Sequence, residues 1–134
     1  MLKSVLRSVR TEAPAPVDAA IEFDDVSLAF LDVSPAQEGH TLVVPRHHVT
    51  SALDDEGELA RIMPMVTKVA HILVDKLGAS GVNLLVNSGT VAGQSVDHLH
   101  VHVIPRYESE PGMSHVRTQL PMRPVDEIHA QLCS

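Results

Sequence analysis

Cysteine, aromatic residues and positive charge are all scarce in this chain of 134 residues. The single cysteine, Cys133, excludes an intrachain disulfide and a zinc site built from cysteines. Aromatic residues make up only 2% and tryptophan is absent, which excludes the stacking platforms that bind single-stranded nucleic acid. The formal net charge of −7 argues against a basic surface for nucleic acid or anionic membrane. We therefore expect neither nucleic acid nor membrane as a partner.

Long apolar runs are absent as well. No stretch approaches the roughly 20 residues that a membrane helix needs, and no apolar segment is followed by a small-residue cleavage site. These features predict a cytoplasmic protein. The composition, 44% hydrophobic and 20% charged, is that of an ordinary globular chain. A chain of this length predicts a single domain over residues 1–134.

The pattern of elements predicts an α+β fold with a mostly antiparallel sheet of about five strands, because the strands come in runs rather than alternating with helices. Strands are expected at 21–23, 27–32, 41–44, 82–86 and 96–104. One long helix is expected at 54–77, capped by Asp54, ended by Gly78, and kinked or divided at Pro64. Residues 1–18 predict a short N-terminal helix and a connector, and residues 107–134 an irregular C-terminal tail.

Nine histidines are the strongest chemical signal in the composition, because imidazole titrates near neutral pH, binds metals and acts as nucleophile or base. Three of them occupy alternate positions: His98, His100 and His102. Successive side chains of a strand point to opposite faces. The alternation therefore predicts that Leu99, Val101 and Val103 enter the core while the three histidines stand in a row on the other face.

Two chemistries suit such a row. A His-x-His pair, about 6.6 Å apart along a strand, can converge on one metal ion, but the third imidazole is then too distant unless the strand bends. His40 or His48 would complete such a metal site. Alternatively, a neutral imidazole attacks phosphorus and forms a covalent phospho- or nucleotidyl-histidine, while its neighbours stabilise the phosphoryl oxygens or protonate the leaving group.

The loop before the triad favours the second chemistry. Residues 87–95, NSGTVAGQS, offer neutral donors from Asn87, Gln94 and Ser95, and Gly93 permits a close approach of the backbone to a ligand. An anion held by neutral donors and histidines is also compatible with a negative net charge.

The segment 93–104, GQSVDHLHVHVI, resembles the histidine-triad (HIT) signature, in which His-x-His-x-His is followed by two apolar residues. Residues 28–35, 39–48 and 81–87 are similar to further segments of that family, and the similarity extends over about residues 12–107. The resemblance implies a HIT-like fold, a homodimer whose two sheets join, and a purine nucleotide as ligand. Some members bind structural zinc through an N-terminal Cys-x-x-Cys that residues 1–6 lack, so we expect no resident metal and no cofactor.

The resemblance also implies roles for individual residues. His100 would attack the α-phosphorus, His102 would contact the phosphate, His98 would orient His100, and His40 would pack against the triad. The remaining candidates would bind the nucleotide: Asp32 at the ribose, Val33 near the base, and Asn87, Gly93, Gln94 and Ser95 around the phosphate or leaving group.

The sequence therefore predicts a hydrolase of purine nucleoside phosphoramidates or dinucleoside polyphosphates that forms a covalent nucleotidyl-histidine on His100. The transferase branch of the family has glutamine in place of the third histidine, so the presence of His102 favours hydrolysis. Two alternatives stay open: a nucleotide-binding sensor or scaffold with incidental turnover, and a metal-dependent enzyme built on the histidines.

Overall fold

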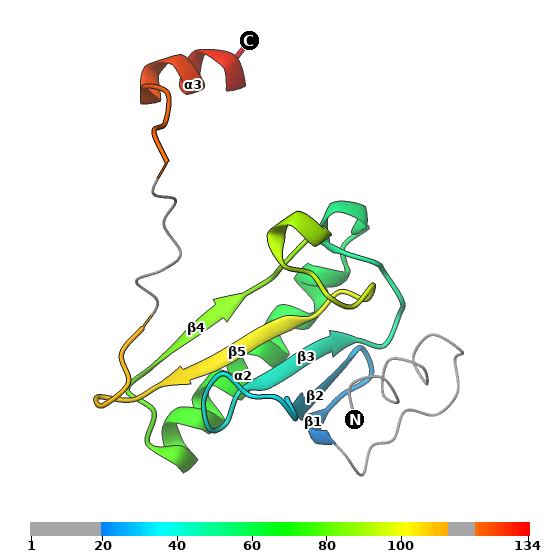
Figure 1. Cartoon of the computed structure of the whole chain (residues 1–134). Coiled ribbons are helices and arrows are strands. Elements are labelled where there is room, and N and C mark those ends of the chain that lie inside the picture. Colours follow the sequence, from blue (N-terminus) through cyan, green and yellow to red (C-terminus); the bar gives the residue numbers. More distant parts are fainter. Residues whose placement is uncertain (1–19, 113–119) are drawn as a thin grey trace.

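The computed structural model describes residues 20–112 and 120–134, and it contains one five-stranded sheet with a long helix across one face (Figure 1). The strands are β1 (Ala20–Phe23), β2 (Ser27–Leu31), β3 (Thr41–Pro45), β4 (Gly81–Leu85) and β5 (Val101–Arg106). Their order in the sheet is β1-β2-β3-β5-β4, and every neighbouring pair is antiparallel. The predicted α+β class is confirmed, whereas the expected N-terminal helix and connector lie outside the described residues.

The fifth strand begins five residues later than predicted, at Val101. The register pairs Val43 of β3 with Val101, so the position opposite residue 99 is Pro45. Proline has no N–H to donate to a ladder, and the N–H of Leu99 donates instead to the carbonyl of Val49, with an N···O distance of 2.8 Å. The prediction that residues 96–100 belong to this strand is therefore wrong.

Proline does not end β5 either, because the strand continues through Pro105 to Arg106. Strand β3 begins at Thr41, which pairs with Val103, so Pro105 lies beyond the last β3 residue of the ladder. A proline is tolerated where no neighbouring strand needs its N–H.

The long helix α2 (Glu58–Leu77) begins after Asp55, whose carboxylate accepts hydrogen bonds from the backbone N–H groups of residues 57–59. The predicted cap, Asp54, lies instead in a short 3₁₀ turn, η2 (Ala52–Asp54). The helix ends as predicted at Gly78, which has the left-handed φ of 73°. Pro64 lies inside the helix without dividing it, since it removes only one hydrogen bond, to the carbonyl of the exposed Ala60.

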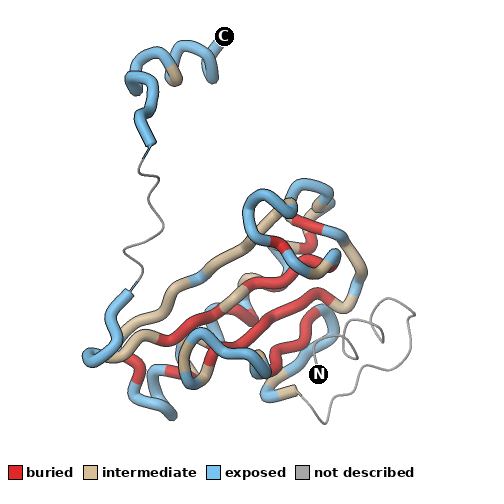
Figure 2. Tube along the Cα trace, viewed as in Figure 1, coloured by how far each residue is buried: buried red, intermediate tan, exposed pale blue. Residues whose placement is uncertain are grey.

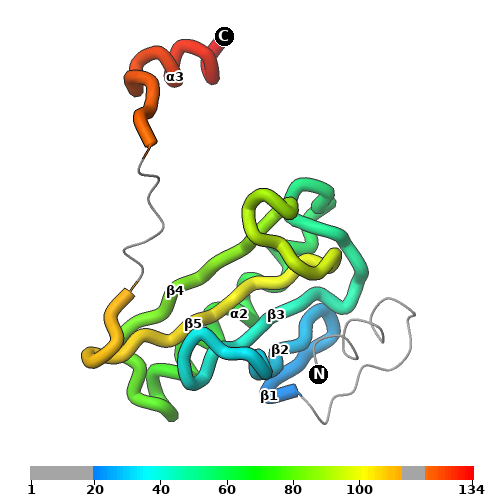
Figure 3. Tube along the Cα trace, in the orientation of Figure 1, coloured from blue at the N-terminus to red at the C-terminus, as the bar shows by residue number. Residues whose placement is uncertain are grey.

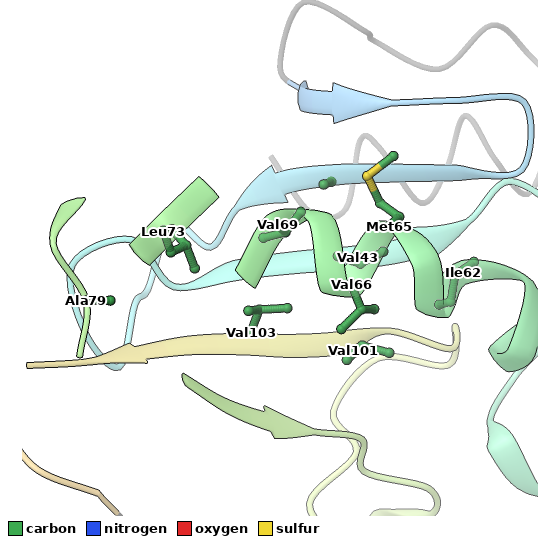
Figure 4. Close-up of a cluster of buried hydrophobic side chains, with 10 residues drawn as sticks. Val43, Ile62, Met65, Val66, Val69, Leu73, Ala79, Val101 and Val103 are labelled. Carbon is green, nitrogen blue, oxygen red and sulfur yellow. The ribbon is translucent and has the colours of Figure 1, made fainter. Parts of the chain in front are cut away.

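Side chains between α2 and the sheet form the main core (Figure 4), and the central strands are the most buried part of the chain (Figure 2). The core residues are Ala29, Val43, Ile62, Met65, Val66, Val69, Leu73, Ala79, Val101 and Val103. A second buried cluster contains Leu28, Phe30, Leu42 and Val44, which alternate with the first along β2 and β3. These two strands are therefore buried on both faces.

The C-terminal tail contains a helix, α3 (Val125–Leu132), where an irregular segment is predicted. Figure 3 shows α3 at the red end of the chain, apart from the sheet. Its apolar residues Val125, Ile128 and Leu132 fall at helical spacing, and Asp126 and Glu127 in its first turn complement the helix dipole. Among the described residues, no helix is long and apolar enough to cross a bilayer.

Candidate active site

The candidate residues come from three segments: the connection between β2 and β3, the loop between β4 and β5, and the start of β5. Asp32 directly follows β2 and His40 directly precedes β3, and the N–H of Asp32 donates to the carbonyl of His40 at 2.9 Å. On β5, His102 pairs with Leu42 of β3 and with Leu85 of β4. Since His40 and Leu42 share a face of β3 by alternation, His40 and His102 lie on the same face of the sheet.

The fourth histidine contacts the triad as the sequence predicts. The Nε2 atom of His40 lies 2.9 Å from the Nδ1 atom of His102, and their ring centroids are 5.1 Å apart. The other ring nitrogen of His40, Nδ1, accepts a hydrogen bond from the backbone N–H of Ala36 at 3.0 Å. His40 is 5% exposed, so its ring is held by buried contacts at both nitrogens.

The central histidine of the triad has a defined tautomer. The Nδ1 atom of His100 lies 2.7 Å from the backbone carbonyl oxygen of His98. A carbonyl only accepts, so Nδ1 of His100 carries the proton, and the neutral ring keeps its lone pair on Nε2. The ring of His102 lies edge-on at 4.9 Å between centroids. His100 therefore combines an unprotonated nitrogen with a neighbouring imidazole.

The first histidine of the triad is buried against a histidine from another segment. His98 is fully buried, its Nδ1 atom lies 2.7 Å from the Nδ1 atom of His48, and its Nε2 atom lies 3.3 Å from the carbonyl oxygen of Pro45. His100 is also buried. The predicted strand alternation does not reach these two histidines, because β5 begins at Val101. The three apolar residues between the histidines are buried as predicted: Leu99, Val101 and Val103.

Gln94 anchors the loop between β4 and β5. Its side-chain oxygen accepts from the N–H of Gly89 at 2.9 Å, and its nitrogen donates to the carbonyls of Thr50 at 2.6 Å and Val96 at 2.9 Å. Both amide hydrogens are thus donated to the protein. These three contacts hold the loop in place, and the role at the phosphate oxygens or the leaving group that the family resemblance implies for Gln94 stays a prediction.

The other loop candidates remain open to a ligand. Gly93 has a left-handed φ of 104°, so this turn favours glycine. Asn87 is half-buried and Ser95 is exposed. After β2, Val33 is exposed and one carboxylate oxygen of Asp32 accepts from the N–H of Ser34 at 2.9 Å.

Burial and neighbouring groups keep the imidazoles of His40 and His102 neutral. Burial, followed by the charges of His100 and His40, lowers the pKa of His102 to about 4, against a smaller opposing effect of Asp32. Burial also lowers the pKa of His40, with Asp32 raising it and Arg106 lowering it. Both rings are therefore uncharged near neutral pH.

One group of these residues has the composition of a metal site. Asp32, His40 and His102 each offer a ligand atom, and these atoms lie within 4.8 Å of one another. The closest approach of the carboxylate is 3.7 Å, between Oδ2 of Asp32 and Nε2 of His40. Whether this group can bind an ion depends on which of its nitrogens carry protons.

The sequence alone does not determine two of the contacts at the site. His48 pairs with His98, yet its position after Pro45 is equally typical of a loop residue in solvent. Ala36 contacts His40 through its backbone N–H, which no side-chain pattern reveals.

A five-stranded antiparallel sheet in which a His-x-His-x-His segment leads into β5, between β3 and β4, and a fourth histidine contacts the third, defines a histidine-triad protein. The chain matches the HIT domain over residues 12–109 and belongs to the HIT family.

Relatives in several organisms support this assignment. A HIT-like protein of Methanocaldococcus jannaschii is 43% identical over 76% of this chain and 77% of its own. The adenosine 5′-monophosphoramidase hnt1 of Schizosaccharomyces pombe is 40% identical over 78% of this chain and 76% of its own. Among solved structures, a HIT family protein from Bacillus subtilis has a TM-score of 0.75 at 33% identity, and covers 95% of this chain and 92% of its own.

Proposed function

We propose that this protein is a nucleotide hydrolase that cleaves adenosine 5′-phosphoramidates through a covalent nucleotidyl intermediate on His100. The observation that carries the proposal is the contact of 2.7 Å between Nδ1 of His100 and the carbonyl oxygen of His98. This contact leaves the lone pair of Nε2 free and holds the ring in place. A positioned neutral imidazole is an effective nucleophile toward phosphorus.

In the proposed first step, Nε2 of His100 forms a bond to the α-phosphorus while the phosphorus–nitrogen bond of the substrate breaks. The electron pair of that bond goes to the leaving nitrogen, which takes a proton from water. The modified ring is cationic, and its Nδ1–H still donates to the carbonyl of His98, which stabilises the charge. In the second step, water attacks the phosphorus and gives a proton to the hydroxide left by the first step. The bond from phosphorus to Nε2 breaks, its electron pair returns to Nε2, and the nucleoside monophosphate leaves.

The surrounding residues have supporting roles in this proposal. His102, next to His100, donates to a phosphoryl oxygen, and Asn87 and Ser95 bind other oxygens or the leaving group. The carboxylate of Asp32 accepts hydrogen bonds from the ribose hydroxyls, and Val33 contacts the base. His98 orients His100 through its backbone carbonyl.

A phosphoramidate is favoured over a dinucleoside polyphosphate for two reasons. The relatives from Schizosaccharomyces pombe and Saccharomyces cerevisiae are named adenosine 5′-monophosphoramidases. In addition, the residues assigned to the phosphate are neutral donors and uncharged imidazoles, which suit one phosphoryl group better than a chain of several charged ones.

The test is to trap the adduct and to remove the nucleophile. Wild-type protein quenched during turnover of adenosine 5′-phosphoramidate should carry one adenylyl group, which peptide mass spectrometry should locate on His100. His100→Ala should lower turnover by at least about a thousandfold. His71→Ala, in the exposed middle of α2, is the matched control and should keep wild-type turnover. Unreduced turnover of His100→Ala, or AMP binding with no turnover of any phosphoramidate by the wild type, would refute the proposal.

We also propose that the protein forms a homodimer through β4. This strand is at the end of the sheet and is paired on one side by β5. An open edge is a template for another strand, and the apolar side chain of Leu84 on β4 is exposed. Leu84→Lys should convert the dimer into a monomer in sedimentation velocity, whereas Leu53→Lys, at an exposed site on η2, should not.

A further inference from the structure

The tautomer of His40 is determined by a backbone amide. The N–H of Ala36 lies 3.0 Å from Nδ1 of His40. A peptide nitrogen carries a permanent hydrogen and can only donate, so Nδ1 of His40 must accept through its lone pair. A neutral imidazole has one proton, and in His40 that proton is therefore on Nε2.

The same argument extends to the next ring. Nε2 of His40 lies 2.9 Å from Nδ1 of His102, and because the former donates, the latter accepts. The single proton of neutral His102 is then on its own Nε2. The Oδ2 atom of Asp32, 3.7 Å from Nε2 of His40, also favours a proton at that position.

Building on the proposed hydrolase, we infer that the N–H of Ala36 acts as a tautomer lock, which through His40 makes Nε2 of His102 a hydrogen-bond donor to the phosphoryl oxygen. The opposite tautomer of His102 would present a lone pair to an anionic oxygen and would repel it. His40 is in this sense a positioning residue, because it acts on the substrate through His102.

The lock also bears on metal binding. A metal held by Asp32, His40 and His102 needs a lone pair on Nε2 of His40, and the lock places a proton there. Shifting that proton to Nδ1 would set two N–H groups against each other, on His40 and on Ala36. The lock therefore disfavours zinc at this cluster, and releasing it should favour zinc.

The direct test is NMR of the full chain with ¹⁵N-labelled histidine at pH 7.5, using long-range ¹H–¹⁵N correlation, which distinguishes protonated from unprotonated ring nitrogens. Assignments come from single His-to-Asn variants. In the wild type, Nδ1 should be unprotonated and Nε2 protonated in both His40 and His102. A protonated Nδ1 on either ring would overturn the inference. This readout requires no turnover, so it can fail or succeed independently of the proposed hydrolase activity.

The variant Ala36→Pro removes the donor N–H, and Ala36→Ser is the matched control because it keeps this group at an exposed position. Ala36→Pro should give mixed tautomers on both rings, a turnover reduced roughly ten- to a hundredfold, and new inhibition by zinc. Ala36→Ser should match the wild type in all three measurements. Wild-type tautomers in folded Ala36→Pro would contradict the lock.

A second pair of variants covers the case in which the proline prevents folding. The side-chain amide of His40→Gln can still donate to Nδ1 of His102, whereas His40→Leu cannot. His102 should keep its proton on Nε2 in His40→Gln and should show mixed tautomers in His40→Leu. Equal tautomer populations of His102 in the two variants would contradict the inference.

Discussion

The Nε2 atom of His40 lies 2.9 Å from the Nδ1 atom of His102, although the two residues are 62 positions apart in the sequence. The contact joins the start of β3 to β5, and it places two uncharged, half- to fully buried rings side by side. This pair makes the stability of the fold depend on pH in a defined direction.

Acidification should destabilise the protein between about pH 6.5 and pH 4. The pKa of His102 is lowered from 6.5 to about 4, mainly by burial, and that of His40 is lowered in the same direction. Between these values the unfolded state binds more protons than the folded state, so stability is fully present above pH 6.5 and is lost as the pH falls toward 4.

The lowering of the pKa of His102 from 6.5 to about 4 corresponds to a loss of about 3 kcal/mol of unfolding free energy at low pH. Solvent screening of this partly exposed ring reduces the expected loss to roughly 2 kcal/mol. Urea unfolding at a series of pH values measures the loss, and His102→Asn should flatten the profile over this window. A profile for His102→Asn as steep as that of the wild type would contradict the assignment.

Gln94→Glu should loosen the loop that carries Asn87 and Ser95. The side-chain nitrogen of Gln94 donates to the carbonyls of Thr50 and Val96, and a carboxylate would place a charged oxygen against both of them. The expected loss is about 2–3 kcal/mol of unfolding free energy, together with reduced turnover. Chemical denaturation measures the loss of unfolding free energy. Gln131→Glu, the same change at an exposed position on α3, should alter stability by less than about 0.5 kcal/mol.

Gly39→Ala should destabilise the turn before His40. Gly39 has a φ of +94°, and an added Cβ would lie 2.7 Å from Cδ1 of Leu77 and 3.2 Å from Cγ of Pro105. Backbone strain and overpacking together predict a loss of roughly 2–4 kcal/mol. The matched control is Gly81→Ala, since a Cβ there meets nothing within 4 Å. Thermal unfolding of both variants should show a large decrease in Tm for the first and almost none for the second.

Local sequence patterns are sufficient to predict most of the strands and the long helix. Alternation and turn residues identify the first four strands within a residue or two at each end, and the helical period with Gly78 identifies α2. The start of β5 escapes prediction because it depends on Pro45, which the sheet register brings opposite residue 99. No local window contains both positions.

For the site, the sequence likewise shows which residues are involved but not which contacts they make. The spacing of His98, His100 and His102 identifies the family, because the residue types themselves are informative. The contacts of each histidine cannot be predicted from that spacing. His98 is buried against His48, and Gln94 donates its amide to the protein; both facts follow from tertiary contacts. The helix α3 is not predicted, because the nearby prolines indicate an irregular segment and its apolar stripe is short.

The insertion of β5 between β3 and β4 has a consequence for folding. Its ladder with β3 joins residues about 60 positions apart, so it closes a long loop and contributes heavily to contact order, which slows folding. Val101 and Val103 sit in the centre of the core, and their amides should exchange with deuterium only through global unfolding. A partly folded chain would consequently lack the assembled histidines altogether, and catalytic competence would appear only when the last strand has docked.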